Sequence, residues 1–171
     1  MDTLEAIATK LDVRAFASKP VPKEVKQKIL EAARLTGSSM NSQHWKFILV
    51  QDRANVKKLA SDSTTGRWAA DADFAILILI NPKIPGSWID AGRVLQDMQL
   101  AAWDSGVVSC VYTGIRDDQV RRDFGVPAEL SPSAVLGFGY PKQKIRGKKK
   151  NRKPIEELAF SETYGGRIQF K

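Results

Sequence analysis

The chain has 171 residues, 43% of them hydrophobic and 27% charged, and a formal net charge of +8. These values are ordinary for one globular domain that buries a core, and we treat residues 1–171 as a single domain. No apolar run approaches the roughly 20 residues of a membrane-spanning helix, and the N-terminus lacks the apolar segment of a secretory signal. We therefore expect a cytoplasmic protein that does not contact membranes.

The chain contains one histidine, His44, and one cysteine, Cys110. These counts argue against a Ser-His-Asp triad with a conventional base and against most zinc sites. Cys110 lies within a strand pattern, where a free cysteine is usually a small buried apolar residue. We assign no catalytic side chain and no metal ligand.

Helical and strand patterns alternate along the chain. We expect helices at residues 3–10, 21–37, 53–63, 87–106 and 116–125. We expect strands at residues 45–52, 71–82, 107–114 and 133–141, and a last exposed strand at residues 165–170. The helix at 87–106 has little polar surface, with Val94, Met98 and Ala102 on one stripe. The order of the elements predicts an α/β sandwich.

The excess positive charge lies in one short segment. Residues 142–153 (KQKIRGKKKNRK) hold eight of the 27 basic residues and no acid, which leaves 19 basic residues to balance the 19 acidic ones. This distribution indicates one local anion site or a solvated segment, and it argues against a broadly basic face.

Two other segments carry groups that bind anions. In KLDVRAF, an extended backbone places Lys10, Asp12 and Arg14 on the same side. The segment TGSSMNSQHW, residues 36–45, offers hydroxyls and amides between a predicted helix and a predicted strand. By itself it is either a polar turn or a ligand-binding loop. The sequence contains neither GxxxxGK[ST] nor a GxGxxG between strand and helix, so side chains would have to bind any phosphate.

The order of these segments resembles the FMN-dependent nitroreductase family. The resemblance rests on K-x-D-x-R-x-F, on ILEAARL-TGSSMNSQHW-KFILV, and on GYP followed by R-K-P-x-E-E. The family pattern has Ser where this chain has Asp12, and Pro where it has His44. The resemblance implies a mixed, mainly antiparallel sheet flanked by helices, an α+β fold, in a homodimer with FMN at the subunit interface.

The resemblance also implies which residues bind FMN. Lys10 and Arg14 match cations that face the phosphate or the flavin, and Lys150 and Arg152 match the pair that grips the phosphate. The complete expected set is Lys10, Asp12, Arg14, Ser38, Ser39, Met40, Asn41, Gln43, Thr113, Gly114, Lys150 and Arg152. Met40, Trp45 and Tyr112 are candidates for an apolar platform under the ring, although Trp45 suits a core anchor equally well.

The implied reaction is a ping-pong transfer. NADH or NADPH would reduce FMN at N5, and the flavin would then reduce a nitroaromatic, a quinone or another electron-poor acceptor. The helix at 87–106 would form the dimer interface or lie inside its own monomer, and the C-terminal segment would reach the partner.

Two alternatives stay open. The first is a nucleic-acid-binding module that uses residues 142–153, although the charge balance of the remaining chain argues against it. The second is a flavin-binding protein without turnover.

Overall fold

The computed structural model describes residues 1–145 and 150–170. The helices are α1 (Thr3–Thr9), α2 (Lys23–Leu35), α3 (Arg53–Ser61), α4 (Ser87–Asp104) and α5 (Asp117–Phe124). Short 3₁₀ turns are η1 (Ser39–Asn41), η2 (Arg67–Asp71) and η3 (Ile155–Glu157). The strands are β1 (Lys46–Val50), β2 (Phe74–Ile80), β3 (Val108–Tyr112) and β4 (Ser131–Gly139). These elements confirm the predicted helices and the first four predicted strands, with ends that differ by at most three residues.

The four strands form one sheet in the order β1-β2-β4-β3, and each pair is antiparallel. The N-terminal segment adds one parallel bridge to the outer edge of β3, between Asp12 and Ser109. All seven residues of β2 are buried, because the strand is central and helices cover both of its faces. The α+β fold and its mainly antiparallel sheet are therefore confirmed.

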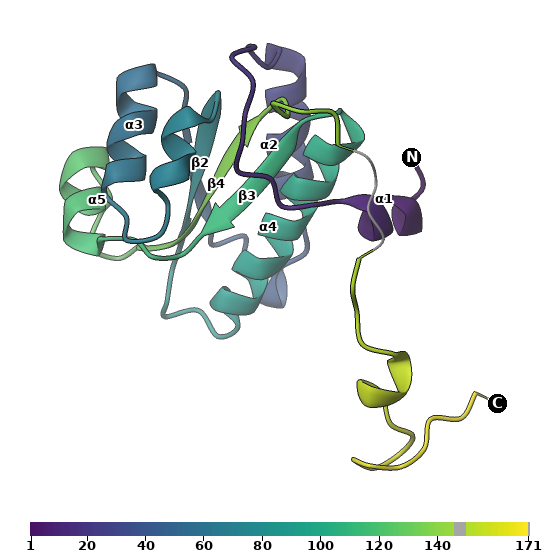
Figure 1. Ribbon diagram of the computed structural model, residues 1–171. Coiled ribbons are helices and arrows are strands. Elements are labelled where there is room, and N and C mark those ends of the chain that lie inside the picture. The colour runs from purple at the N-terminus through teal and green to yellow at the C-terminus, as the bar shows by residue number, and fades with distance from the viewer. Residues whose placement is uncertain (146–149, 171) are drawn as a thin grey trace.

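Alternate residues of β2 enter two different cores. Phe74, Ile76 and Ile78 pack against α2 and α4, whereas Ala75, Leu77 and Leu79 pack on the side of α3 and α5. Figure 1 shows these helix pairs on opposite sides of the sheet. This arrangement leaves the outer edge of β3 open to the N-terminal segment, and the candidate site develops along that edge.

The predicted strand at residues 165–170 is wrong. The backbone there pairs with no strand among the described residues, and the Gln169 amide instead donates to Ser161 Oγ at 2.7 Å. Figure 1 shows the segment after residue 150 running away from the sheet, so no strand edge lies beside it. Within the described ranges, no helix combines the length and the apolar character needed to cross a membrane.

Candidate functional site

Lys10 and Asp12 form a polar network at the edge of β3. Lys10 is only 8% exposed, and its Nζ donates to Asp12 Oδ1 and to Gln99 Oε1, both at 2.9 Å. Gln99 Nε2 donates to Asp12 Oδ1 at 2.9 Å and to Ser109 Oγ at 3.1 Å. Partial burial raises the pKa of Asp12, but the hydrogen bonds from Lys10 and Gln99 outweigh it and hold the pKa below its usual range. The Lys10 ammonium thus already has two hydrogen-bond acceptors within the protein, Asp12 and Gln99.

The end of the basic segment returns to this network. Lys150 Nζ donates to the Ile7 carbonyl at 2.5 Å. Burial lowers the pKa of Lys150, and the nearby charges of Arg152 and Lys10 lower it further, while Asp12 opposes them. Several cations therefore gather around one carboxylate, which favours binding of an anion. Positions 146–149 of the basic strip proposed for nucleic acid lie outside the described residues.

Arg14 lies farther along the same edge. Its Nε donates to Cys110 Sγ at 3.5 Å, and its guanidinium carbon lies 5.7 Å from the ring centroid of Trp68, a cation–π distance. Cys110 is 3% exposed, as predicted for a buried apolar residue. Trp68 was not among the expected site residues. It comes from η2 and places an aromatic face beside the predicted cation.

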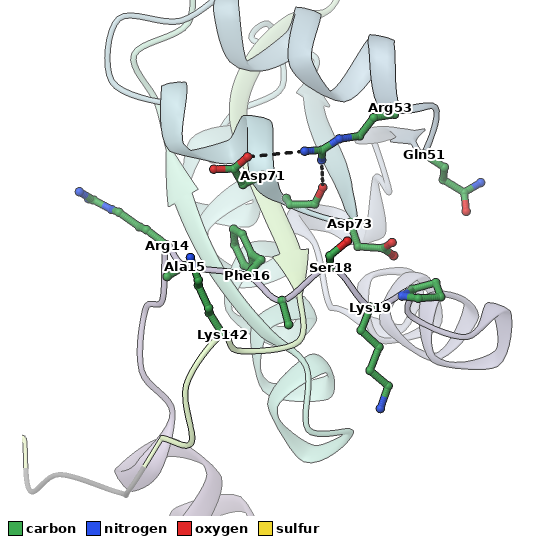
Figure 2. Close-up of a pocket in the computed structure, with 13 residues that line it drawn as sticks. Arg14, Ala15, Phe16, Ser18, Lys19, Gln51, Arg53, Asp71, Asp73 and Lys142 are labelled. Atoms are coloured by element: carbon green, nitrogen blue, oxygen red, sulfur yellow. Dashed lines mark hydrogen bonds and ion pairs between the residues drawn. The ribbon is translucent and has the colours of Figure 1, made fainter.

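A separate cavity of about 600 Å³ lies next to Arg14. Figure 2 shows the Arg14 side chain pointing away from this cavity. Arg53 donates to the Ala72 carbonyl at 2.9 Å and lies 3.5 Å from Asp71, while Asp73 accepts from the Val21 amide at 3.0 Å. Arg53 and Asp71 on the cavity wall are therefore paired with each other, and the wall also carries Lys19 and Lys142.

Thr113 and Gly114 lie where the chain leaves β3. The Gly114 carbonyl accepts from the Thr64 amide at 2.8 Å, which joins this turn to the loop before η2. A Cβ added at Gly114 would lie 2.4 Å from Thr64 Oγ1 and 2.6 Å from Thr65 Oγ1. A side chain at this position would therefore displace the hydroxyls of Thr64 and Thr65. Lys10, Arg14 and Gly114 therefore mark successive positions along one edge of the fold.

The loop between α2 and β1 has an unusual backbone. Met40, Asn41 and Gln43 have φ of 52°, 53° and 44°, in the left-handed region that residues with a Cβ seldom adopt. Ser38 Oγ accepts from the Gln43 amide at 2.9 Å. Gln43 Nε2 donates to Asn41 Oδ1 at 3.2 Å, and Met40 is 79% exposed. The segment is an ordered loop with exposed polar groups, which favours a binding role over a simple connection.

Two of the proposed platform residues are not available to a ligand. Trp45 is 6% exposed and belongs to the core between the sheet and α2 and α4. Tyr112 is 4% exposed, and its hydroxyl donates to the Leu59 carbonyl at 2.9 Å. Both side chains complete cores, and the exposed Met40 is the one candidate of the three that a ligand can reach.

Within one chain, the loop at residues 38–43 does not join the charged network. The loop contacts α4 at Asp90, which accepts from the Ser39 amide at 2.8 Å, whereas the network contacts α4 at Gln99. The nine positions between Asp90 and Gln99 correspond to about 13 Å along the helix and to opposite flanks of it. A single chain thus carries two separate groups of candidate residues.

Comparison with known proteins agrees with this fold. A profile of the Nitroreductase family matches residues 7–77 and 64–140. A protein of Methanothermobacter thermautotrophicus named "Putative NADH dehydrogenase/NAD(P)H nitroreductase" is 35% identical over 150 residues, which cover 82% of this chain and 78% of that protein. A protein of Archaeoglobus fulgidus with the same name is 31% identical over 151 residues, which cover 82% of this chain and 86% of that protein.

The fold is also found among solved structures. An FMN-dependent nitroreductase of Clostridium difficile matches with a TM-score of 0.86 at 24% identity, over 94% of this chain and 100% of that one. From the family profile and from the two archaeal relatives, we conclude that the chain belongs to the Nitroreductase family.

Proposed function

We propose that this protein is an FMN-dependent NAD(P)H oxidoreductase that reduces a nitroaromatic, a quinone or another electron-poor small molecule. The observation that carries the proposal is the cluster of cations at the edge of β3. Lys150 lies near both Lys10 and Arg152, and Asp12 is the carboxylate beside Lys10 and Lys150. An FMN phosphate carries close to two negative charges near pH 7, as phosphate monoesters do, and would relieve the repulsion between these cations.

The residues present fit FMN in their chemistry. Arg152 suits a bidentate contact with phosphate, and Lys150 adds a point charge. Arg14, Thr113 and Gly114 follow along the same edge and would hold the polar edge of the ring. Bound FMN supplies two-electron transfer between a nicotinamide and the acceptor, so the chain needs only to bind and orient the reactants.

The two separate groups of candidate residues support a homodimer. Ser39 and Lys10 lie on opposite flanks of α4, so one FMN would contact both groups only if the loop came from a second copy. The outer surface of α4 offers Trp88 and Ile89, which are 59% and 72% exposed. Exposed apolar side chains on one helix face are typical of a subunit interface. We propose that α4 packs on its core through one face and on the partner through the other.

The C-terminal segment supports the same assembly. It extends away from the sheet in Figure 1 and carries exposed aromatic side chains, with Tyr164 93% and Phe170 86% exposed. Such residues gain stability when another surface covers them. We propose that this segment packs on the partner subunit.

A visible spectrum of the purified protein tests the proposed function. We expect a flavin band that disappears under anaerobic conditions when NADH or NADPH is added and returns when a quinone is added. A protein that is colourless and takes up no added FMN would contradict the proposal. Retention of FMN without oxidation of NAD(P)H in the presence of a quinone would indicate a flavin-binding protein without turnover.

A further inference from the structure

A buried carboxylate on α4 contacts the loop at residues 37–44, here called the ligand loop. Asp90 is 2% exposed, and its Oδ2 accepts from the Ser39 amide at 2.8 Å. The same oxygen lies 3.4 Å from His44 Nε2, at the other end of the ligand loop. We infer that Asp90 is a positioning residue that holds the ligand loop in its binding conformation; this inference rests on the proposed function.

The first turns of α4 contact the ligand loop at further points. Arg93 lies 3.4 Å from Asp90 Oδ1, and its guanidinium would be 2.7 Å from a Cβ added at Gly37. At Gly86, a Cβ would be 3.6 Å from the Ser39 Cβ. The helix therefore supports the ligand loop at its start, its middle and its end. Asp90 is the residue of α4 that contacts both the middle of the ligand loop, at Ser39, and its end, at His44.

The backbone of the ligand loop needs such support. Met40, Asn41 and Gln43 are held in the left-handed region, which is disfavoured for residues with a side chain. Such conformations persist when surrounding contacts determine them. Within the ligand loop, Ser38 Oγ accepts from the Gln43 amide, and among the described residues Asp90 is the side chain that contacts both Ser39 and His44.

Asp90 can perform this role because it is both charged and well supported. It is followed one turn later by Val94, which is fully buried against the sheet, so the helix here does not move freely. Burial raises the pKa of Asp90, but the hydrogen bonds from the Ser39 amide and from His44 and the charges of His44 and Arg93 keep the pKa below its usual range. The carboxylate is therefore ionised at neutral pH and accepts strong hydrogen bonds.

The contact between Asp90 and the ligand loop is measurable without FMN. In flavin-free protein, we expect Asp90→Ala to speed hydrogen exchange of the Ser39 amide by about tenfold or more, the effect of losing one hydrogen bond to a charged acceptor. Asp90→Asn should largely restore slow exchange, because an amide oxygen can accept the same two hydrogen bonds. Asp97→Ala is the matched control, since Asp97 on the same helix accepts from Thr36 Oγ1 at 2.6 Å, just before the ligand loop begins.

The positioning role is read from FMN affinity. We expect Asp90→Ala to raise the Kd for FMN about tenfold, with recovery in Asp90→Asn and little change in Asp97→Ala. In a chain that already carries Ser39→Ala and Asn41→Ala, Asp90→Ala should raise the Kd for FMN by a smaller factor than in the wild type. In a chain that carries Arg152→Ala, it should raise the Kd by the same factor as in the wild type. Equal effects in both backgrounds, or an equal loss in Asp97→Ala, would overturn the inference.

A milder variant covers the case in which Asp90→Ala does not fold. His44→Phe keeps a ring against Trp45, whose centroid lies 5.5 Å away, and removes the contact with Asp90. We expect a several-fold rise in the FMN Kd and faster exchange of the Gln43 amide. Unchanged values for both would refute the inference. If the wild-type protein binds no FMN, the proposed function fails, and the exchange measurements still decide whether Asp90 holds the ligand loop.

Discussion

Lys10 and Arg152 are both cations of the candidate site, but the structure gives them different roles. Lys10→Met removes an ammonium that is 8% exposed and makes two hydrogen bonds of 2.9 Å. It leaves Gln99 Oε1 buried without this donor. A hydrogen bond to a charged group contributes about 1.5–3 kcal/mol. The ion pair with Asp12 adds little, because the Asp12 side chain is 53% exposed and solvent screens it. We expect the free energy of unfolding to fall by about 2 kcal/mol.

Arg152→Ala should act on the ligand and not on the fold. Among the contacts of Arg152 is a hydrogen bond from its Nη1 to the neighbouring Asn151 carbonyl at 2.8 Å, a local contact on the surface. We expect its stability to stay within about 0.5 kcal/mol of wild type. Its FMN affinity should fall by about 1.5–3 kcal/mol, the scale of a charged hydrogen bond to phosphate. Arg167→Ala is the matched control, an exposed arginine of the same C-terminal segment.

Two measurements separate the two roles. Urea unfolding of flavin-free protein, followed by circular dichroism, gives stability, and quenching of flavin fluorescence gives FMN affinity. We expect Lys10→Met to lose mainly stability, Arg152→Ala to lose mainly FMN affinity, and Arg167→Ala to change neither. If Lys10→Met keeps full stability and loses as much FMN affinity as Arg152→Ala, Lys10 binds the ligand and does not stabilise the fold through Gln99.

Three further variants test other parts of the structure. Asp62 lies at the C-terminal end of α3, where a negative charge is unfavourable, and burial and the nearby Asp123 raise its pKa. Ionising Asp62 therefore destabilises the folded protein, and this cost grows as pH rises from about 4 through the folded pKa. In urea unfolding, Asp62→Asn should therefore stabilise by about 1 kcal/mol at pH 7.5 and by little at pH 4; an equal gain at both values would contradict this reasoning. Gly114→Ala should push aside the hydroxyl of Thr64 and weaken FMN binding about tenfold in fluorescence titrations, and wild-type affinity would argue against a flavin contact there. Ile89→Asp changes a side chain that is 72% exposed, so we expect an unchanged circular dichroism spectrum. Light scattering should show a monomer, and this monomer should hold little FMN. A dimer that still holds its flavin would exclude α4 from the interface.

The sequence predicts the elements well because each has a local cause. The apolar run that became β2 is long enough for one strand, and Pro82 follows its end. The stripe of Val94, Met98 and Ala102 indicates a helix with one buried face, and all three are fully buried. The strand expected at residues 165–170 shows the limit of such reasoning. A weak alternation of apolar and polar residues is a property of one segment alone, whereas a strand also needs a neighbouring sheet edge with which its backbone can form hydrogen bonds.

The site was predictable in part. The segments near Lys10 and Lys150 were expected to meet, and they lie close enough for the charge of Lys10 to lower the pKa of Lys150. The pattern could not show that the Lys10 ammonium is held by Gln99, because a buried polar partner on a distant helix leaves no local signal. Trp45 shows the same limit for aromatic residues, since a core anchor and a ligand platform have the same composition. Several positions of α4 are polar, and nothing in the sequence marked Asp90 and Gln99 as the polar residues that are buried.

The chemistry expected of this chain follows from how its few reactive side chains are engaged. The single histidine, His44, is buried against Asp90, and the single cysteine, Cys110, is buried beneath Arg14. Neither is placed as a free acid, base or nucleophile. A flavin oxidoreductase tolerates this arrangement, because the cofactor carries the electrons and the protein supplies position and charge. Substitutions in the site should therefore act by changing how FMN is bound and oriented. They should alter the affinity for FMN and the rate of its reduction, but none of them would remove a group that transfers a proton.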